Sequence, residues 1–326
     1  MKQEVFDIVL LIALPASGKS EVRHYMSSVP ADRLRKEFHI GENLQLDDFP
    51  YVFMMRRIDE ELEKLGEKRP FYPTDYSPFF DGRDWGTLVH LLNEDYRDMR
   101  SHRVIKTDSA AELLFDRLDT AGLQAGIEPR LALLKPETRK KLAAALEPEA
   151  RKMLEEKQAA YPDTMEGKTL IIECARGGQQ GAAMPLEGTA GYQYTLPLFS
   201  PEILSRAAIL YIWVTPEESR RKNADRADPN DPGSNLHHST PMEVMLYDYG
   251  CDDMEYLTGV SGKKNTVKVE SCGKEWFIPT GILDNRQDKT SFLRDDPSAW
   301  KQADLDVFAG TLKTVTDGMY EAYKER

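Results

Sequence analysis

Residues 12–21 read IALPASGKSE and nearly fit the phosphate-binding pattern G-x-x-x-x-G-K-[ST], with Ala13 in the place of the first glycine. In such a loop successive backbone N–H groups hold phosphate oxygens, and the following helix N-terminus adds its dipole. Gly18 lets the backbone approach a phosphate closely, Lys19 reaches the β- and γ-phosphates, and Ser20 places its hydroxyl on Mg²⁺. Alanine fits at position 13 without strain if its φ is negative. The pattern predicts a site for ATP and Mg²⁺ formed by Ala13, Pro15, Ala16, Ser17, Gly18, Lys19, Ser20 and Glu21.

The segments on either side of this loop supply the strand and the helix that the motif requires. The run IVLLIA is apolar and partly β-branched and ends at a turn signal, which predicts a strand buried on both faces. The run KSEVRHYMSS predicts a helix that ends before Pro30. This context favours a nucleotide site over an ordinary strand-to-helix turn.

Acidic residues stand at the ends of two further predicted strands. The segment IGENLQLDDF ends with Asp47 and Asp48, and KTLIIE ends with Glu173. Ligands of an open parallel sheet bind outside the carboxyl ends of its strands, and an attacking hydroxyl must give its proton to a nearby carboxylate. Asp47 is therefore a candidate base, unless Asp47 and Asp48 only cap the next helix. Glu173 is a candidate ligand of Mg²⁺, directly or through water, or an alternative base.

Two polar segments follow the predicted strands in the C-terminal half. The run CARGGQQGAAMPLEGTAG after Glu173 includes Arg176, and it is either a substrate contact or a flexible surface loop. The run WVTPEESRRKNADRADPNDPGSN resembles a kinase lid, in which guanidinium groups clamp the transferring phosphoryl group and closure excludes water. Arg221 and Arg226 are the favoured lid residues, ahead of Arg220, and a solvated charged helix is the alternative.

The remaining pattern predicts one α/β domain that covers residues 1–326. Buried strands at IVLLIA, KTLIIE, AAILYIWV and EWFIPTGIL alternate with helices, which indicates a mainly parallel sheet with right-handed crossovers. Apolar residues recur at three- and four-residue spacing between the predicted strands IGENLQLDDF and KTLIIE. We therefore expect residues 61–162 to form a mainly helical insertion.

The composition narrows the range of partners and compartments. The formal net charge of −12 disfavours nucleic acid and anionic membranes as partners. No apolar run approaches the ~20 residues of a membrane span, and the apolar N-terminal run reads as a strand and not as a signal peptide. The chain has three scattered cysteines, which predict neither a disulfide framework nor a zinc site. These features suggest a cytoplasmic protein.

LPASGKSE followed by LQLDDF resembles the P-loop kinases of the polynucleotide kinase and zeta-toxin type. Their first strand leads into G-x-P-G/A-S-G-K-S, and their second strand ends in R-D-D-[FY]. The first motif is matched by Pro15, Ser17, Gly18, Lys19 and Ser20, and the second by Asp47, Asp48 and Phe49. Leu46 stands where these kinases often have arginine, and the segment from Lys19 to Asp47 is longer than usual.

The resemblance implies the three-layer α/β fold of P-loop NTPases and the role of base for Asp47. We therefore expect a kinase that transfers the γ-phosphoryl group of Mg·ATP to a hydroxyl of a small-molecule acceptor. A polynucleotide 5′-hydroxyl kinase is the alternative within enzymes, which the acidic charge disfavours. A regulatory ATP-binding switch is the alternative outside enzymes, and it needs neither a base nor an arginine lid.

Overall fold

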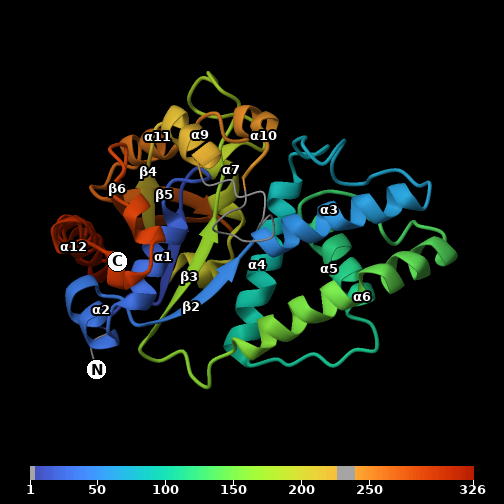
Figure 1. Cartoon of the computed structure of the whole chain (residues 1–326), viewed down its shortest axis with the longest axis horizontal. Helices are drawn as coiled ribbons and strands as arrows, with labels where there is room; N and C mark the ends of the chain where they lie inside the picture. The colour runs from blue at the N-terminus through green and yellow to red at the C-terminus, as the bar shows by residue number, and fades with distance from the viewer. Residues whose placement is uncertain (1–3, 226–238) are drawn as a thin grey trace. The chain divides into compact units, whose positions relative to one another are not determined.

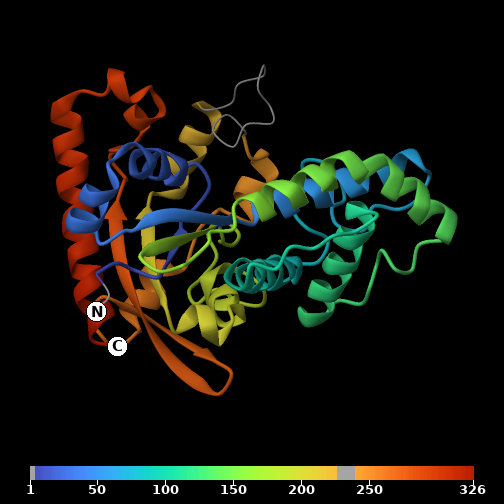
Figure 2. The ribbon, with the colours of Figure 1, turned by 90° about the horizontal axis from the view of Figure 1, so that it is seen from below.

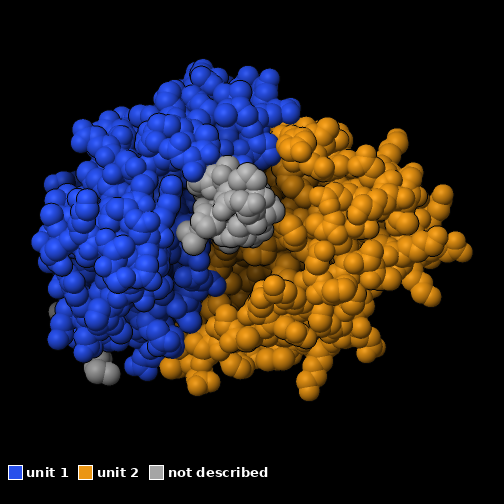
Figure 3. Space-filling model, viewed as in Figure 1, with its two compact units in different colours: residues 1–45, 166–326 blue, residues 46–165 orange. Residues whose placement is uncertain are grey.

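The computed structural model describes residues 4–225 and 239–326, so the predicted lid residue Arg226 lies outside the described residues. The chain divides into two compact units, coloured separately in Figure 3. Unit 1 comprises residues 1–45 and 166–326, and unit 2 comprises residues 46–165. Among the described residues, no helix combines the length and the apolar character that crossing a membrane would require.

A six-stranded sheet establishes the α/β class (Figure 1). The strand order is β2-β3-β1-β4-β6-β5. β1 is parallel to β3 and β4, β4 is parallel to β6, and β5 pairs antiparallel with β6. The β5–β6 hairpin was not predicted from the sequence. The strands are β1 (Ile8–Ile12), β2 (Glu42–Asp47), β3 (Lys168–Cys174), β4 (Ala207–Trp213), β5 (Thr266–Ser271) and β6 (Lys274–Asp284).

The helices of unit 1 alternate with these strands. The long helix α12 packs on β6 and β4 and runs along one side of the sheet in Figure 2. α2 packs against α12 and was not predicted, because its eight residues give too short an apolar pattern. The helices are α1 (Lys19–Ser28), α2 (Ala31–Phe38), α7 (Gly191–Thr195), α8 (Pro201–Leu204), α9 (Pro216–Asp225), α10 (Met242–Tyr247), α11 (Met254–Gly259) and α12 (Gln302–Lys324), with short 3₁₀ turns η1 (Leu196–Leu198), η2 (Ser291–Arg294) and η3 (Pro297–Ala299).

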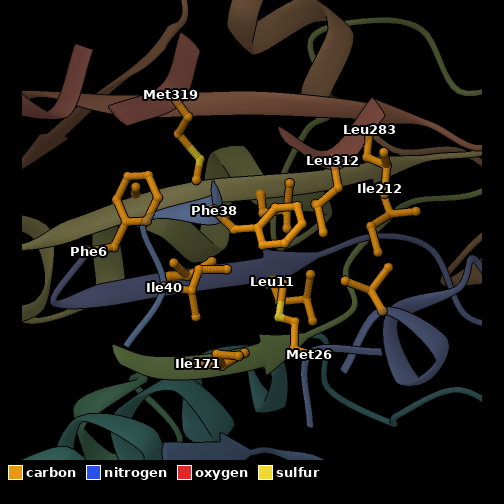
Figure 4. Packing of buried hydrophobic residues seen from close by; sticks show 14 of the residues in the cluster. Phe6, Leu11, Met26, Phe38, Ile40, Ile171, Ile212, Leu283, Leu312 and Met319 are labelled. Atoms are coloured by element: carbon orange, nitrogen blue, oxygen red, sulfur yellow. The ribbon is translucent and has the colours of Figure 1, made fainter. Parts of the chain in front are cut away.

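Both faces of β1 are buried, as its apolar sequence predicts. Val9 and Leu11 point to one face, where they join a core cluster that includes residues of α1, α2 and α12 (Figure 4). Leu10 points to the opposite face and is equally buried. On that second face the hydroxyl of Tyr211 donates to Asp252, which places the segment before α11 against the sheet. A strand buried on both sides is a rigid support for the loop that follows it.

Unit 2 has a hydrophobic core of its own. Between Phe49 and Ala159 the secondary-structure elements are all α-helices. The segment predicted as a helical insertion, 61–162, lies within this unit. The first helix begins at Phe49, earlier than expected, because Pro50 fits the first turn of a helix. The helices are α3 (Phe49–Lys64), α4 (Asp84–Ser101), α5 (Ala110–Gln124) and α6 (Pro136–Ala159).

Asp59 on α3 ties the segment after this helix to the core of unit 2. Its side chain is fully buried and accepts the backbone N–H groups of Phe71 and Tyr72 at 3.1 and 2.7 Å. Arg69 Nε lies 3.8 Å from its carboxylate. Burial raises the pKa of Asp59 to about 7, against the effect of these donors.

This shift predicts a pH-dependent contribution to stability. Between about pH 4 and pH 7 the folded chain holds more protons at Asp59 than the unfolded chain, so this contribution falls as the pH rises. In urea unfolding, the free-energy advantage of the wild type over Asp59→Asn should be larger at about pH 5 than at about pH 8. Glu63→Gln is the control, because Glu63 also contacts Arg69 but is 65% exposed. An advantage that does not change with pH would contradict the assignment.

Candidate functional site

The carboxyl ends of four parallel strands meet at one edge of the sheet. Ile12 is in register with Cys174 of β3 and with Tyr211 of β4, and Trp213 is in register with Asp284 of β6. The chain leaves β1 toward β2, but it leaves β3 toward β4 on the other side of β1. The crossover direction therefore reverses between β1 and β3, and such a switch point is the usual ligand site of an open α/β sheet.

The loop of residues 13–18 begins at this switch point and has the backbone conformation of a tight turn. Gly18 has φ 108° and ψ 11°, and Ala16 has φ 55°, a left-handed conformation that is strained for alanine. Ala13 is not among the described residues with positive φ, so alanine is tolerated there, as expected. α1 begins directly after Gly18, and the first backbone N–H groups of a helix lack an intrahelical acceptor. The loop and the helix start together offer amide groups to an anion.

Side chains from distant segments bind the carbonyl groups of this loop. Tyr192 OH donates to the Ala13 carbonyl at 3.1 Å, Ser219 Oγ donates to the Pro15 carbonyl at 2.7 Å, and Asn285 Nδ2 donates to the Ser17 carbonyl at 2.7 Å. We call Tyr192, Ser219 and Asn285 the bracing side chains. The C=O and the next N–H of a trans peptide point in opposite directions. Each bracing bond therefore turns the following amide, at positions 14, 16 and 18, away from its brace.

Gly18 is closely packed against one of these segments. A Cβ atom at this position would lie 2.5 Å from Thr290 Oγ1 and 3.0 Å from Asn285 Nδ2. Asn285 Nδ2 also donates to Thr290 Oγ1 at 2.8 Å, which fixes both side chains. Glycine is needed at position 18 for two separate reasons, its positive φ and the absence of a side chain.

The side chain of Lys19 reaches back to the loop that precedes it in the sequence. Its Nζ is 3.5 Å from the carbonyl oxygens of Ala13 and Leu14, and the residue is 8% exposed. Both distances are at the long limit for a hydrogen bond, so these contacts are weak. A phosphate would offer the ammonium group a stronger, charge-assisted partner at little cost in lost contacts.

Two acidic side chains near the loop, Glu173 and Glu21, form ion pairs with arginines. Glu173, at the end of β3, accepts from Arg23 Nη1 at 2.6 Å, and Glu21 accepts from Arg294 Nε at 2.6 Å. Within the described ranges, no group of three or more His, Cys, Asp or Glu side chains is arranged to hold a metal. Mg²⁺ bound with a nucleotide does not need such a group, because waters and phosphates complete its coordination.

Asp47 and Asp48 lie where β2 ends and α3 begins. Asp47 Oδ1 accepts the backbone N–H of Phe49 at 2.8 Å. Asp48 is at the N-cap position of α3, but its side chain makes no capping bond. The capping alternative is therefore realised by Asp47, through one of its two carboxylate oxygens.

The arginines of α9 differ in the direction they face. Arg221 is 52% exposed and forms ion pairs with Glu218 and Asp225 on its own helix. Arg220 is only 16% exposed, and its Nη1 is buried without a hydrogen-bond partner in the described part of the chain. The sequence pattern favoured Arg221, but helical periodicity turns Arg221 to solvent and Arg220 toward the protein. Arg220 follows the bracing residue Ser219 directly, so it is the better candidate for contact with a phosphoryl group.

The glycine-rich run after β3 is an ordered part of unit 1. A Cβ atom at Gly177 would lie 2.4 Å from the Cys251 carbonyl oxygen, and one at Gly250 would lie 2.3 Å from the Gln180 nitrogen. Gly178 and Cys251 exchange two backbone hydrogen bonds. These glycines allow two backbone segments to pack directly on each other, whereas residues 179–185 of the same run lie exposed on the surface.

The buried Asp253 supports the bracing residue Tyr192, and Asp252 beside it binds Tyr211; the sequence pattern gave neither aspartate a functional role. Asp253 accepts the backbone N–H groups of Tyr192 and Gln193 at 2.7 and 2.8 Å. Asp252 accepts from Tyr211 OH at 2.8 Å, and burial raises its pKa to about 6. Arg176 is also buried, and its backbone N–H donates to Tyr192 OH at 3.2 Å. The positions of Asp253 and Asp252 thus depend on contacts with Tyr192 and Tyr211, which lie 61 and 41 residues away in the sequence.

Comparison of the chain with protein-family models, curated proteins and solved structures yields no match.

The packing of Gly18 predicts a large effect of adding one methyl group. Gly18→Ala should lower the free energy of unfolding by at least about 2 kcal/mol, because strain at positive φ and a clash with Thr290 add together. Gly181→Ala is the control, since Gly181 also has positive φ (78°) but open space around it. Urea unfolding of both variants measures the difference. Equal destabilisation of the two variants would show that the contact with Thr290 is unimportant.

Proposed function

We propose that this protein is a kinase with the P-loop NTPase fold, which transfers the γ-phosphoryl group of Mg·ATP to a hydroxyl of a small-molecule acceptor. The proposal rests on the position and the bonding of the loop after β1. The loop after β1 lies at the switch point of the sheet, and its carbonyl groups at Ala13, Pro15 and Ser17 are bound by side chains from elsewhere. The strand order, the left-handed Gly18 and the position of Lys19 support the same conclusion.

Each side chain near the loop has a distinct task in this proposal. The loop amides and the start of α1 hold the phosphates, and Lys19 balances their charge. Ser20 and Glu173 are the residues that would hold Mg²⁺, which would supply positive charge against the charge that develops during transfer. Arg220 stabilises charge on the transferring group from the side of α9. Since Ser219 binds the loop directly, Arg220 is held in place before the reaction begins.

Asp47 is the favoured base, and Glu173 is its competitor. The Glu173 carboxylate is already paired with Arg23 at 2.6 Å, an arrangement that suits a group oriented toward a metal ion and its waters. Asp47 has one oxygen fixed by the amide of Phe49, and this bond orients the carboxylate. A carboxylate held in a fixed orientation is suited to general-base catalysis.

Removal of the Lys19 charge should weaken ATP binding and abolish phosphoryl transfer without unfolding the protein. Lys19→Ala loses only two weak contacts, whereas a charge-assisted bond to phosphate contributes about 1.5–3 kcal/mol. We expect the affinity for Mg·ATP in calorimetry to fall by about 10- to 100-fold, and phosphoryl transfer to be lost. Lys36→Ala is the control, because Lys36 is an exposed lysine on α2. Unchanged ATP affinity in Lys19→Ala would refute the nucleotide site.

Three matched substitutions identify the base. Asp47→Asn should slow the chemical step by about 10²–10⁴-fold with little change in ATP affinity. Asp48→Asn should leave the rate nearly unchanged, and Glu173→Gln should raise the Mg²⁺ requirement. Single-turnover transfer from radiolabelled ATP to a panel of small hydroxyl compounds provides the measurement and identifies the acceptor.

The outcomes separate the competing roles. A dead Glu173→Gln beside an active Asp47→Asn would assign the base to Glu173. Near-normal nucleotide turnover in all three variants, with no labelled acceptor, would favour a regulatory ATP-binding switch over a kinase.

A further inference from the structure

A polar cavity of about 350 Å³ lies between α4 and α5 within unit 2. One face of α4, from His90 to Ser101, forms one wall, and one face of α5, from Arg117 to Gln124, forms the other. Arg103, just after α4, completes the lining. We call this cavity the α4–α5 groove. Its volume falls in the range of sites that bind small molecules.

A buried network of charges lies behind the groove and joins its lining at Arg117 and Glu94. Asp95 accepts from Tyr51 OH, Arg117 Nη2 and Lys157 Nζ, each at 2.6 Å. Arg117 Nε also donates to Glu94 at 3.0 Å. Because the carboxylate and both cations have several partners, the wall of the groove is fixed before any ligand arrives.

The charges around the groove leave an excess of positive charge on its surface. The carboxylates that line the groove are Glu94 and Asp98, which are already bonded to Arg117 and Lys157 respectively. The cations that line it are Arg97, Arg103 and Arg117. Arg103 lies 3.5 Å from Asp98 and is 65% exposed. Among the residues that the structure describes, Arg97 has no carboxylate partner, and its side chain donates a single hydrogen bond, to the Asn93 carbonyl of its own helix at 3.4 Å.

The uncharged polar groups of the groove are suited to a ligand with hydroxyl groups. Ser101 and Thr120 donate their hydroxyl protons to carbonyls of their own helices, so their oxygens remain able to accept. Burial lowers the pKa of His90, which keeps its imidazole neutral. His90 Nε2 has no hydrogen-bond partner in the described chain. An unmet buried polar group of this kind costs about 1–3 kcal/mol, which a ligand would recover by pairing with it.

We propose that the α4–α5 groove binds a small anionic molecule that carries hydroxyl groups, with its phosphate or carboxylate group on Arg97 and Arg103. The bound anion balances the excess positive charge, and the ligand hydroxyls donate to Ser101 and Thr120. This site lies wholly within unit 2 and involves none of the residues assigned to ATP. The proposed ligand site is therefore independent of the proposed kinase activity.

The test uses calorimetry of the full chain with two probes, inorganic phosphate and citrate, in the absence of Mg²⁺. All variants also carry Lys19→Ala, so that binding at the loop after β1 does not contribute. Arg97→Gln with Arg103→Gln removes two exposed positive charges from the groove. Lys140→Gln with Lys141→Gln is the matched control, because it removes two exposed positive charges from α6 away from the groove.

We expect one site per chain, weakened at least about tenfold by the arginine pair and changed less than about twofold by the lysine pair. Stronger binding of phosphate identifies a phosphorylated ligand, and stronger binding of citrate identifies a carboxylate. Circular dichroism checks that each variant is folded. Absence of binding by both probes, or equal affinity in the two double variants, overturns the proposal. Neither result affects the test of ATP binding, which depends on Lys19.

Discussion

The candidate site depends on hydrogen bonds that hold the carbonyl groups of the loop after β1. Each bracing side chain comes from a different segment of unit 1, and Asn285 is 268 residues from the serine whose carbonyl it binds. A loop of small residues has many conformations of similar energy, and fixing one of them costs conformational entropy. The free energy of folding unit 1 offsets this loss of entropy, so the loop amides are oriented before any ligand binds. Preorganised donors of this kind are the most effective way to stabilise developing charge.

The bond from Ser219 to the loop also restricts the position of α9. α9 is fixed to the loop by Ser219 and to the segment after β6 by the buried Lys222, whose Nζ lies 2.6 Å from Asp288. Arg220 lies on the inner side of this helix, whereas Arg221 contributes to its charged outer face.

Unit 2 uses buried charge in a different way. Asp95 joins side chains from α3, α5 and α6 to α4, since Tyr51, Arg117 and Lys157 all donate to its carboxylate. Such a network adds little to net stability but disfavours other packings of the four helices, because any shift would leave a buried charge without a partner. The α4–α5 groove is one consequence of this fixed arrangement.

The sequence by itself determined the features that depend on local pattern. The apolar run of β1, the glycine loop, α1 and the helical character of unit 2 were predicted because neighbouring residues set strand, turn and helix preferences. The strand ends that carry Asp47 and Glu173 followed from the same patterns. Only the tertiary structure decided that Arg220 faces inward, that Gly177 and Gly178 pack on a second backbone segment, that Asp253 is buried, and that β5 pairs with β6. These features depend on partners that are distant in the chain, and a local pattern carries no information about which distant group will meet it.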